Sequence, residues 1–182
     1  MSDEPRTAIR DLIDRLGRLS AAEEWAHRLN PAQRAALAYL GRANQVSRAP
    51  SHVAEFLATT RGTASQTLKT LERKGFIKAE RSAADRRSIR YDVTREGSEA
   101  LRLTDELDAA IAALAPDAAR SLEAGLFLVA RAALTRRNQR SFGVCRSCRH
   151  HRATETGGFC ELLNVALSLE DASQLCHEHA QL

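Results

Sequence analysis

The stretch TTRGTASQTLKTLERKGFIKAERSAADRRSIRYDVTR, residues 59–95, decides the fold. It is typical of a helix followed by two short strands that form a hairpin, with Asp85, Arg86 and Arg87 at the tip. Ten Lys and Arg against four Asp and Glu give it a net charge of +6, whereas the whole chain carries +4. A basic helix beside a basic hairpin suits a DNA groove, because each DNA strand presents a row of phosphates.

The helix is predicted to begin after Thr60, whose hydroxyl suits an N-cap, and to end at Gly75, which suits a left-handed residue. Ala64, Leu68 and Leu71 form one apolar stripe at helical spacing. For this helix alone, an ordinary amphipathic helix with a solvated face is the alternative. The candidate DNA-binding residues lie on or beside the polar face and at the hairpin tip: Arg61, Gly62, Thr63, Ser65, Gln66, Lys69, Thr70, Arg73, Arg86 and Arg87.

The flanking segments favour DNA binding. Asn30-Pro31 is predicted to start one helix and Pro50-Ser51 a second, which ends just before Thr59 and Thr60. Two short helices joined by a tight turn form a helix-turn-helix. Residues 77–80 and 89–93 alternate apolar and polar side chains, which predicts the two strands of a hairpin; a plain surface hairpin is the alternative.

These elements, in this order, resemble the winged helix-turn-helix of the MarR family of bacterial transcriptional regulators. The resemblance spans roughly residues 9–140 and is carried by TLERKGFI at 70–77, DRR at 85–87 and TREG at 94–97. It implies a homodimer on double-stranded DNA with a pseudo-palindromic operator, one recognition helix in the major groove of each half-site. It also implies a pocket between domains for a small-molecule effector.

We therefore predict a mainly α fold with a small β-hairpin wing, a winged helix-turn-helix with N- and C-terminal dimerisation helices. The expected domains are an N-terminal dimerisation helix, the DNA-binding domain, C-terminal dimerisation helices and a cysteine-rich tail, at residues 1–29, 30–96, 97–140 and 141–182. Thr94 is expected to cap one long helix that Ala115-Pro116 interrupts.

Three apolar helical faces flank the winged helix, more than so small a unit needs. Pairing with a second copy would bury them, and packing within one chain is the alternative. The apolar positions are Ile9, Leu12, Ile13, Leu16 and Leu19, then Leu101, Leu107, Ile111 and Leu114, and finally Leu122, Leu126, Val129 and Ala133.

All four cysteines lie in the last 38 residues, with the spacing C-x2-C-x11-C-x15-C, and predict a metal centre at Cys145, Cys148, Cys160 and Cys176. A redox dithiol pair is the alternative. MSDEPRTAIR shows no secretory signal and no apolar run is long enough to span a membrane, so we expect a cytoplasmic chain with reduced thiols and no membrane partner.

Four thiolates suit either zinc or an iron–sulfur cluster. Only one C-x2-C knuckle is present, which favours the cluster, with zinc as the alternative. Whether His177 or His179 is a ligand stays open.

The sequence thus predicts a homodimeric DNA-binding repressor whose operator affinity depends on the cysteine centre. Cluster loss or oxidation would move the tail against the dimerisation helices. The alternative is a repressor that responds to a small aromatic ligand, with a structural zinc in the tail. An adaptor that does not bind DNA is a further possibility. An enzyme is not expected, because the chain has no paired-carboxylate motif, phosphate-cradling glycine loop or nucleophile elbow.

Overall fold

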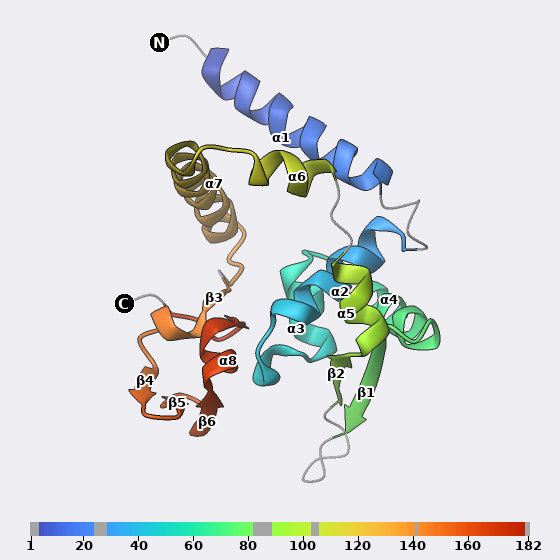
Figure 1. Ribbon diagram of the computed structural model, residues 1–182, viewed down its shortest axis with the longest axis vertical. Coiled ribbons are helices and arrows are strands. Elements are labelled where there is room, and N and C mark those ends of the chain that lie inside the picture. The colour runs from blue at the N-terminus through green and yellow to red at the C-terminus, as the bar shows by residue number, and fades with distance from the viewer. Residues whose placement is uncertain (1–3, 24–28, 82–88, 103–105, 141, 181–182) are drawn as a thin grey trace.

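The computed structural model describes residues 4–23, 29–81, 89–102, 106–140 and 142–180. The chain forms three regions: a winged helix, helical arms that precede and follow it in the sequence, and a small β-rich tail at the C-terminal end (Figure 1). The elements before the tail are α1 (Glu4–Glu23), α2 (Pro31–Arg42), the 3₁₀ turn η2 (Gln45–Ser47), α3 (Pro50–Phe56), α4 (Arg61–Arg73), β1 (Ile77–Arg81), β2 (Ile89–Val93), α5 (Arg95–Leu101), α6 (Glu106–Ala112) and α7 (Pro116–Arg136).

The predicted start of α2 is confirmed by a reciprocal cap. The Asn30 side chain accepts a hydrogen bond from the Gln33 N–H at 2.9 Å, and the Gln33 side chain accepts one from the Asn30 N–H at 3.3 Å. Proline occupies the first turn of both α2 and α3, where its missing N–H costs nothing. The core that these helices share with α4 contains the fully buried side chains of Leu37, Tyr39, Leu40, Val53, Leu68 and Leu71.

The wing is an antiparallel pair in which Ile77 lies opposite Val93 and Arg81 opposite Ile89. Thr94 then caps α5 by accepting a hydrogen bond from the Gly97 N–H at 3.1 Å. The mainly α winged helix-turn-helix with a hairpin wing is therefore confirmed. The predicted hairpin tip, Asp85, Arg86 and Arg87, lies outside the described residues.

The single long helix predicted after Thr94 is wrong over its first part, since the structure has α5 and α6 on either side of residues 103–105, which it does not describe. Leu101 packs against the winged-helix core instead of serving a dimerisation face. Gly41 makes this possible, because a Cβ there would lie 2.7 Å from the Leu101 Cδ1. α6 in turn lies against α1 (Figure 1).

The arms α1, α6 and α7 lie on the side of the molecule away from the wing (Figure 1). Every described residue of α6 and α7 is at least partly exposed. The predicted apolar faces of α1 and α7 are therefore left exposed within one chain: Leu12 is 58% exposed on α1, and Leu126 is 46% exposed on α7. Among the described residues, no helix is both long and apolar enough to cross a membrane.

The tail is a separate small fold beside α3 (Figure 1). β4, β5 and β6 form an antiparallel sheet, and β3 pairs with β7. Its elements are β3 (Gly143–Val144), η3 (Cys145–Ser147), β4 (His151–Thr154), β5 (Gly157–Cys160), β6 (Val165–Ser168), α8 (Leu169–Ser173) and β7 (Leu175–Cys176).

Candidate DNA-binding surface and cysteine centre

Helix α4 has the two faces that its sequence predicts. Thr60 caps it by accepting a hydrogen bond from the Thr63 N–H at 3.1 Å, and Gly75 follows with φ of +80°. Ala64, Leu68 and Leu71 are buried against the core. Because these residues fix the rotation of the helix, its opposite face is turned to solvent.

The other candidates follow from this rotation. Arg61, Gly62, Thr63, Gln66, Lys69 and Arg73 are exposed, whereas Ser65 and Thr70 are half-buried. The Thr70 hydroxyl donates to the Gln66 carbonyl at 3.0 Å, which leaves it able only to accept from DNA. Arg86 and Arg87 lie outside the described residues, and the DNA-binding role of the whole set stays a prediction.

Two cations of the wing, Lys78 and Arg90, are paired with Glu80. Glu80 accepts hydrogen bonds from Arg90 at 2.6 Å and from Lys78 at 2.9 Å. The Arg90 hydrogen bond, followed by that of Lys78, lowers the pKa of Glu80 to about 2. Counting the Lys and Arg residues along 59–95 therefore overstates the number of wing cations that are free to bind DNA phosphates, because Arg90 pairs with Glu80 across the two strands.

The tail brings all four cysteines together and buries them, with exposed fractions of 3–6%. Cys145 and Cys148 form a tight knuckle in which the Cys148 N–H donates to the Cys145 carbonyl at 3.0 Å. Cys160 ends β5 and Cys176 lies in β7. None of the four forms a disulfide.

The thiols influence one another electrostatically. A hydrogen bond between Cys145 and Cys176 lowers the pKa of Cys176 to about 6 and raises that of Cys145. Charge on Cys160 and Cys148 raises the pKa of Cys145 further. No group of three or more His, Cys, Asp or Glu side chains in the described part of the chain is arranged to hold a metal ion as it stands. Metal binding would have to displace the thiol protons first.

The tail is attached to the helix-turn-helix by backbone pairing. Ala43, at the end of α2, forms a parallel β-bridge with Leu175, and the Asn44 N–H donates to the Leu175 carbonyl at 2.9 Å. Gln45 adds hydrogen bonds from its N–H and its side-chain amide to the Asp171 carboxylate, at 3.1 and 3.2 Å.

Two aromatic contacts extend this attachment. Phe142 packs edge-on against the rings of Tyr39 and Phe56. The His177 ring stacks on His52 of α3 with centroids 3.4 Å apart. The tail thus contacts residues 43–56, where the chain enters the helix-turn-helix, and its movement against the dimerisation helices on cluster loss or oxidation stays a prediction.

The two histidines considered as ligands both have protein contacts. Desolvation, followed by the neighbouring His52, lowers the pKa of His177 to about 4, so its ring is neutral at neutral pH. The His177 Nε2 lies 3.0 Å from a Glu178 carboxylate oxygen. The His179 Nε2 lies 3.1 Å from the Ser147 hydroxyl.

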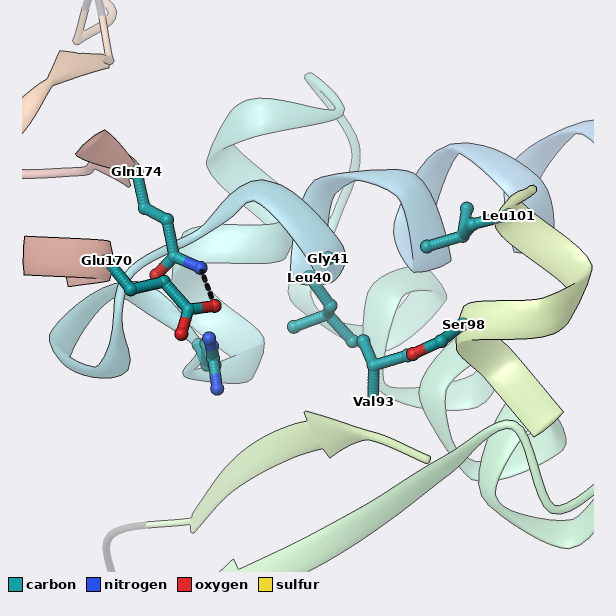
Figure 2. A pocket seen from close by; sticks show the side chains of 8 residues that line it. Leu40, Gly41, Val93, Ser98, Leu101, Glu170 and Gln174 are labelled. Atoms are coloured by element: carbon teal, nitrogen blue, oxygen red, sulfur yellow. Dashed lines mark hydrogen bonds between the residues drawn. The ribbon is translucent and has the colours of Figure 1, made fainter. Parts of the chain in front are cut away.

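A cavity of about 320 Å³ lies between the winged helix and the tail (Figure 2). The winged helix contributes Leu40, Val93 and Leu101, and the tail contributes Glu170 and Gln174, whose side chains hydrogen-bond at 3.1 Å. The cavity therefore combines an apolar wall with a polar one.

Arg48 lines the same cavity and is held in place from both sides. It pairs with the Asp92 carboxylate at 2.8 Å, and its Nε donates to the Ala43 carbonyl at 2.9 Å. This ion pair joins η2 to the second wing strand.

Sequence reasoning missed the polar residues beneath Cys176. Asn44 and Ser47 are completely buried beside Cys176: the Asn44 N–H donates to the Leu175 carbonyl at 2.9 Å, and the Ser47 hydroxyl accepts from the His177 N–H at 3.0 Å. Tyr39 is buried beside them and donates its hydroxyl to the Ser47 carbonyl at 2.7 Å. No local signal marks these residues, since Cys176 lies about 130 positions further along the chain.

Comparison with known proteins agrees with this fold. Residues 28–88, which are 61 of the 182 residues, match the family model described as MarR family. No curated protein matches the chain.

Several solved structures share the fold. The crystal structure of the S. aureus MepR–DNA complex is 19% identical, with a TM-score of 0.55, 70% of this chain and 96% of that one being covered. Streptococcus pneumoniae FabT in complex with DNA is 24% identical, with a TM-score of 0.55 and coverage of 69% and 95%. A MarR transcriptional regulator from Methanosarcina mazei Go1 is 17% identical, with a TM-score of 0.58 and coverage of 74% and 99%.

Proposed function

We propose that this chain is a DNA-binding transcriptional regulator, a repressor, that places α4 in the major groove of its operator. The observation that carries the proposal is the exposed polar face of α4, with Gln66 and Lys69 at its centre and a buried stripe behind it. The MarR family match and the DNA complexes among proteins of the same fold support it. The proposed activity is binding and not catalysis.

The regulator is proposed to be a homodimer. Its arms expose a row of large apolar side chains on α1 and α7, which a monomer in water seldom leaves uncovered. A second copy of the same arms is a self-complementary partner. Pairing them would place two recognition helices against successive major grooves, as a pseudo-palindromic operator requires.

The tail is proposed to hold a metal through Cys145, Cys148, Cys160 and Cys176. Four buried thiols in one small fold are the donor set of zinc and of iron–sulfur clusters. Thiolates about 2.3 Å from one zinc ion stand about 3.8 Å apart, a separation at which two thiols also hydrogen-bond. Four thiolates suit a single zinc ion, whereas the spacing of the cysteines, with one C-x2-C knuckle, favours a cluster.

Operator affinity measured with and without the metal tests this proposal. The purified chain is analysed for zinc and iron and its visible spectrum is recorded without oxygen. Binding to a DNA fragment from its own promoter region is then followed by fluorescence anisotropy, before and after chelation. We expect specific binding that changes when the metal leaves. Equal affinity for the promoter and for unrelated DNA would refute the regulator.

A small-molecule effector is a second candidate for the signal, and the cavity in Figure 2 is the observation that favours it. A small aromatic ligand there would touch Leu40 and Val93 on one wall and the tail on the other, with structural zinc in the tail. Under this alternative, adding the ligand would change operator affinity while the zinc stays bound in the tail.

A further inference from the structure

We infer that Asn44 and Ser47 of the helix-turn-helix complete the cysteine centre as hydrogen-bond donors to the Cys176 sulfur. Metal binding in the tail and the position of the segment that leads into α3 are then one coupled event. The inference rests on the proposed metal centre and adds the route by which that centre acts on DNA binding.

Asn44 supplies the first observation. Its side chain is completely buried, and neither its amide nitrogen nor its amide oxygen has a partner in good hydrogen-bond geometry. Its backbone N–H donates to the Leu175 carbonyl at 2.9 Å, which places Asn44 next to the β7 residue that precedes Cys176. A buried amide without a partner is costly, so its presence here points to an acceptor that draws it in. A metal-bound thiolate is such an acceptor, because it keeps its negative charge at all ordinary pH values.

Ser47 supplies the second observation. It is the last residue of the 3₁₀ turn η2, which begins directly after Asn44. Its side chain is fully buried, and its hydroxyl oxygen accepts a hydrogen bond from the His177 N–H at 3.0 Å. The hydroxyl proton of Ser47 can therefore point either at the sulfur of Cys176, the residue before His177, or at the His177 Nδ1, which lies 3.4 Å away. A charged sulfur is the stronger acceptor of the two.

The backbone on both sides of Cys176 is tied to the same turn. Leu175 accepts the Asn44 N–H before the cysteine, and His177 donates to Ser47 after it. Cys176 is thus the ligand through which the helix-turn-helix contacts the centre on both sides. Outer hydrogen bonds of this kind hold a ligand in position and raise metal affinity.

The turn connects the centre to the recognition helix over a short path. The Ser47 carbonyl accepts the Tyr39 hydroxyl, which fixes the turn to α2. Three residues later α3 begins, and α3 packs against α4 through the buried side chains of Val53 and Ala54. Binding or loss of a metal at the Cys176 sulfur would therefore act on the start of α3, the first helix of the pair that is proposed to bind DNA.

The test uses the full-length chain with Zn²⁺ and Co²⁺ as probes. Asn44→Leu keeps the volume of the side chain and removes both polar atoms. Ser47→Ala removes only the hydroxyl and serves if the first variant folds poorly. Gln45→Ala is the matched control, because it breaks an exposed contact of the same turn with Asp171 and leaves the neighbours of the sulfur in place. Zn²⁺ affinity is measured by competition with a chromophoric chelator.

We expect Zn²⁺ to bind 10–100-fold more weakly to Asn44→Leu and Ser47→Ala, the usual cost of losing an outer partner of a metal ligand, and Gln45→Ala to match the wild type. The thiolate-to-cobalt absorption should keep its intensity in all variants, because every cysteine remains. Amide exchange at Asn44 and His177 should slow on Zn²⁺ loading in the wild type. In Ser47→Ala, loading should no longer protect His177, and operator affinity should lose its dependence on Zn²⁺.

Two outcomes overturn the inference and are easily told apart. If both variants bind Zn²⁺ as tightly as the wild type and keep its metal-dependent operator affinity, Asn44 and Ser47 do not contribute to the metal centre. The proposed metal centre itself is then unaffected. If the wild type itself binds neither Zn²⁺ nor Co²⁺ through its thiols, the proposed centre fails and the inference fails with it.

Discussion

Replacing the two central side chains of the α4 polar face should separate DNA binding from folding. Gln66 and Lys69 are exposed, whereas Leu68 between them is fully buried. Surface substitutions away from caps and cores change the free energy of unfolding by about 0.5 kcal/mol or less. We therefore expect Gln66→Ala and Lys69→Ala to melt within a degree or two of the wild type, since about 1 kcal/mol shifts the melting temperature by only about 2–4 °C in a protein of this size.

The effect on DNA should be much larger and should differ between the two. A side-chain amide that reads a base contributes about 1–3 kcal/mol of discrimination, so Gln66→Ala should weaken operator binding by about 5- to 150-fold for each half-site and leave non-specific binding unchanged. Loss of one phosphate contact lowers the slope of log affinity against log salt by about 0.9, so Lys69→Ala, which removes one contact from each subunit of the proposed dimer, should lower the slope by about 1.8.

Anisotropy titrations of the operator at several salt concentrations, with an unrelated duplex in parallel, measure both quantities. Arg18→Ala, on α1 and remote from α4, is the charge-matched control for Lys69→Ala. Unchanged operator affinity in both variants would refute the assignment of this face to DNA. A large fall in melting temperature would show instead that the side chains support the fold.

Three further substitutions test other parts of the structure. Thr60→Ala removes the hydrogen bond to Thr63 that caps α4, and should lower the free energy of unfolding by about 0.5–2 kcal/mol in urea titrations. Tyr39→Phe leaves the buried Ser47 carbonyl without its donor and should cost about 1–3 kcal/mol. Because burial raises the pKa of Tyr39, the wild type should lose stability as pH rises above about 10, and the variant should lose less over that range. Leu126→Glu puts a charge on an exposed apolar face and should shift sedimentation toward the monomer with little change in the stability of each chain.

Features encoded by residues close together in the chain could be predicted from the sequence. The caps at Asn30, Thr60 and Thr94 each bind a backbone N–H three residues away, so the pattern of residue types suffices to find them. The stripe of α4 and the alternation of both wing strands follow from helical and strand periodicity in the same way.

Features that depend on pairing between residues far apart in the chain could not be predicted from the sequence. The sequence shows Glu80 and Arg90 as separate charges, and only the register of the hairpin places them opposite each other. Leu101 fits a helical repeat with Leu107 and Ile111, yet the space over Gly41 draws it into the winged-helix core. The attachment of the tail is the extreme case, since Ser47 and His177 are 130 residues apart.

The position of the tail also bears on how a signal in it would reach DNA. The surfaces proposed for dimerisation and for the cysteine centre differ: the exposed apolar faces belong to α1 and α7, whereas β7 pairs with residues at the end of α2. A change at Cys176 would therefore act on each subunit's own helix-turn-helix before it could alter the pairing of subunits. Loss of metal should weaken operator binding in a dimer that stays intact, because the ordering of α3 and α4 changes and the arms do not.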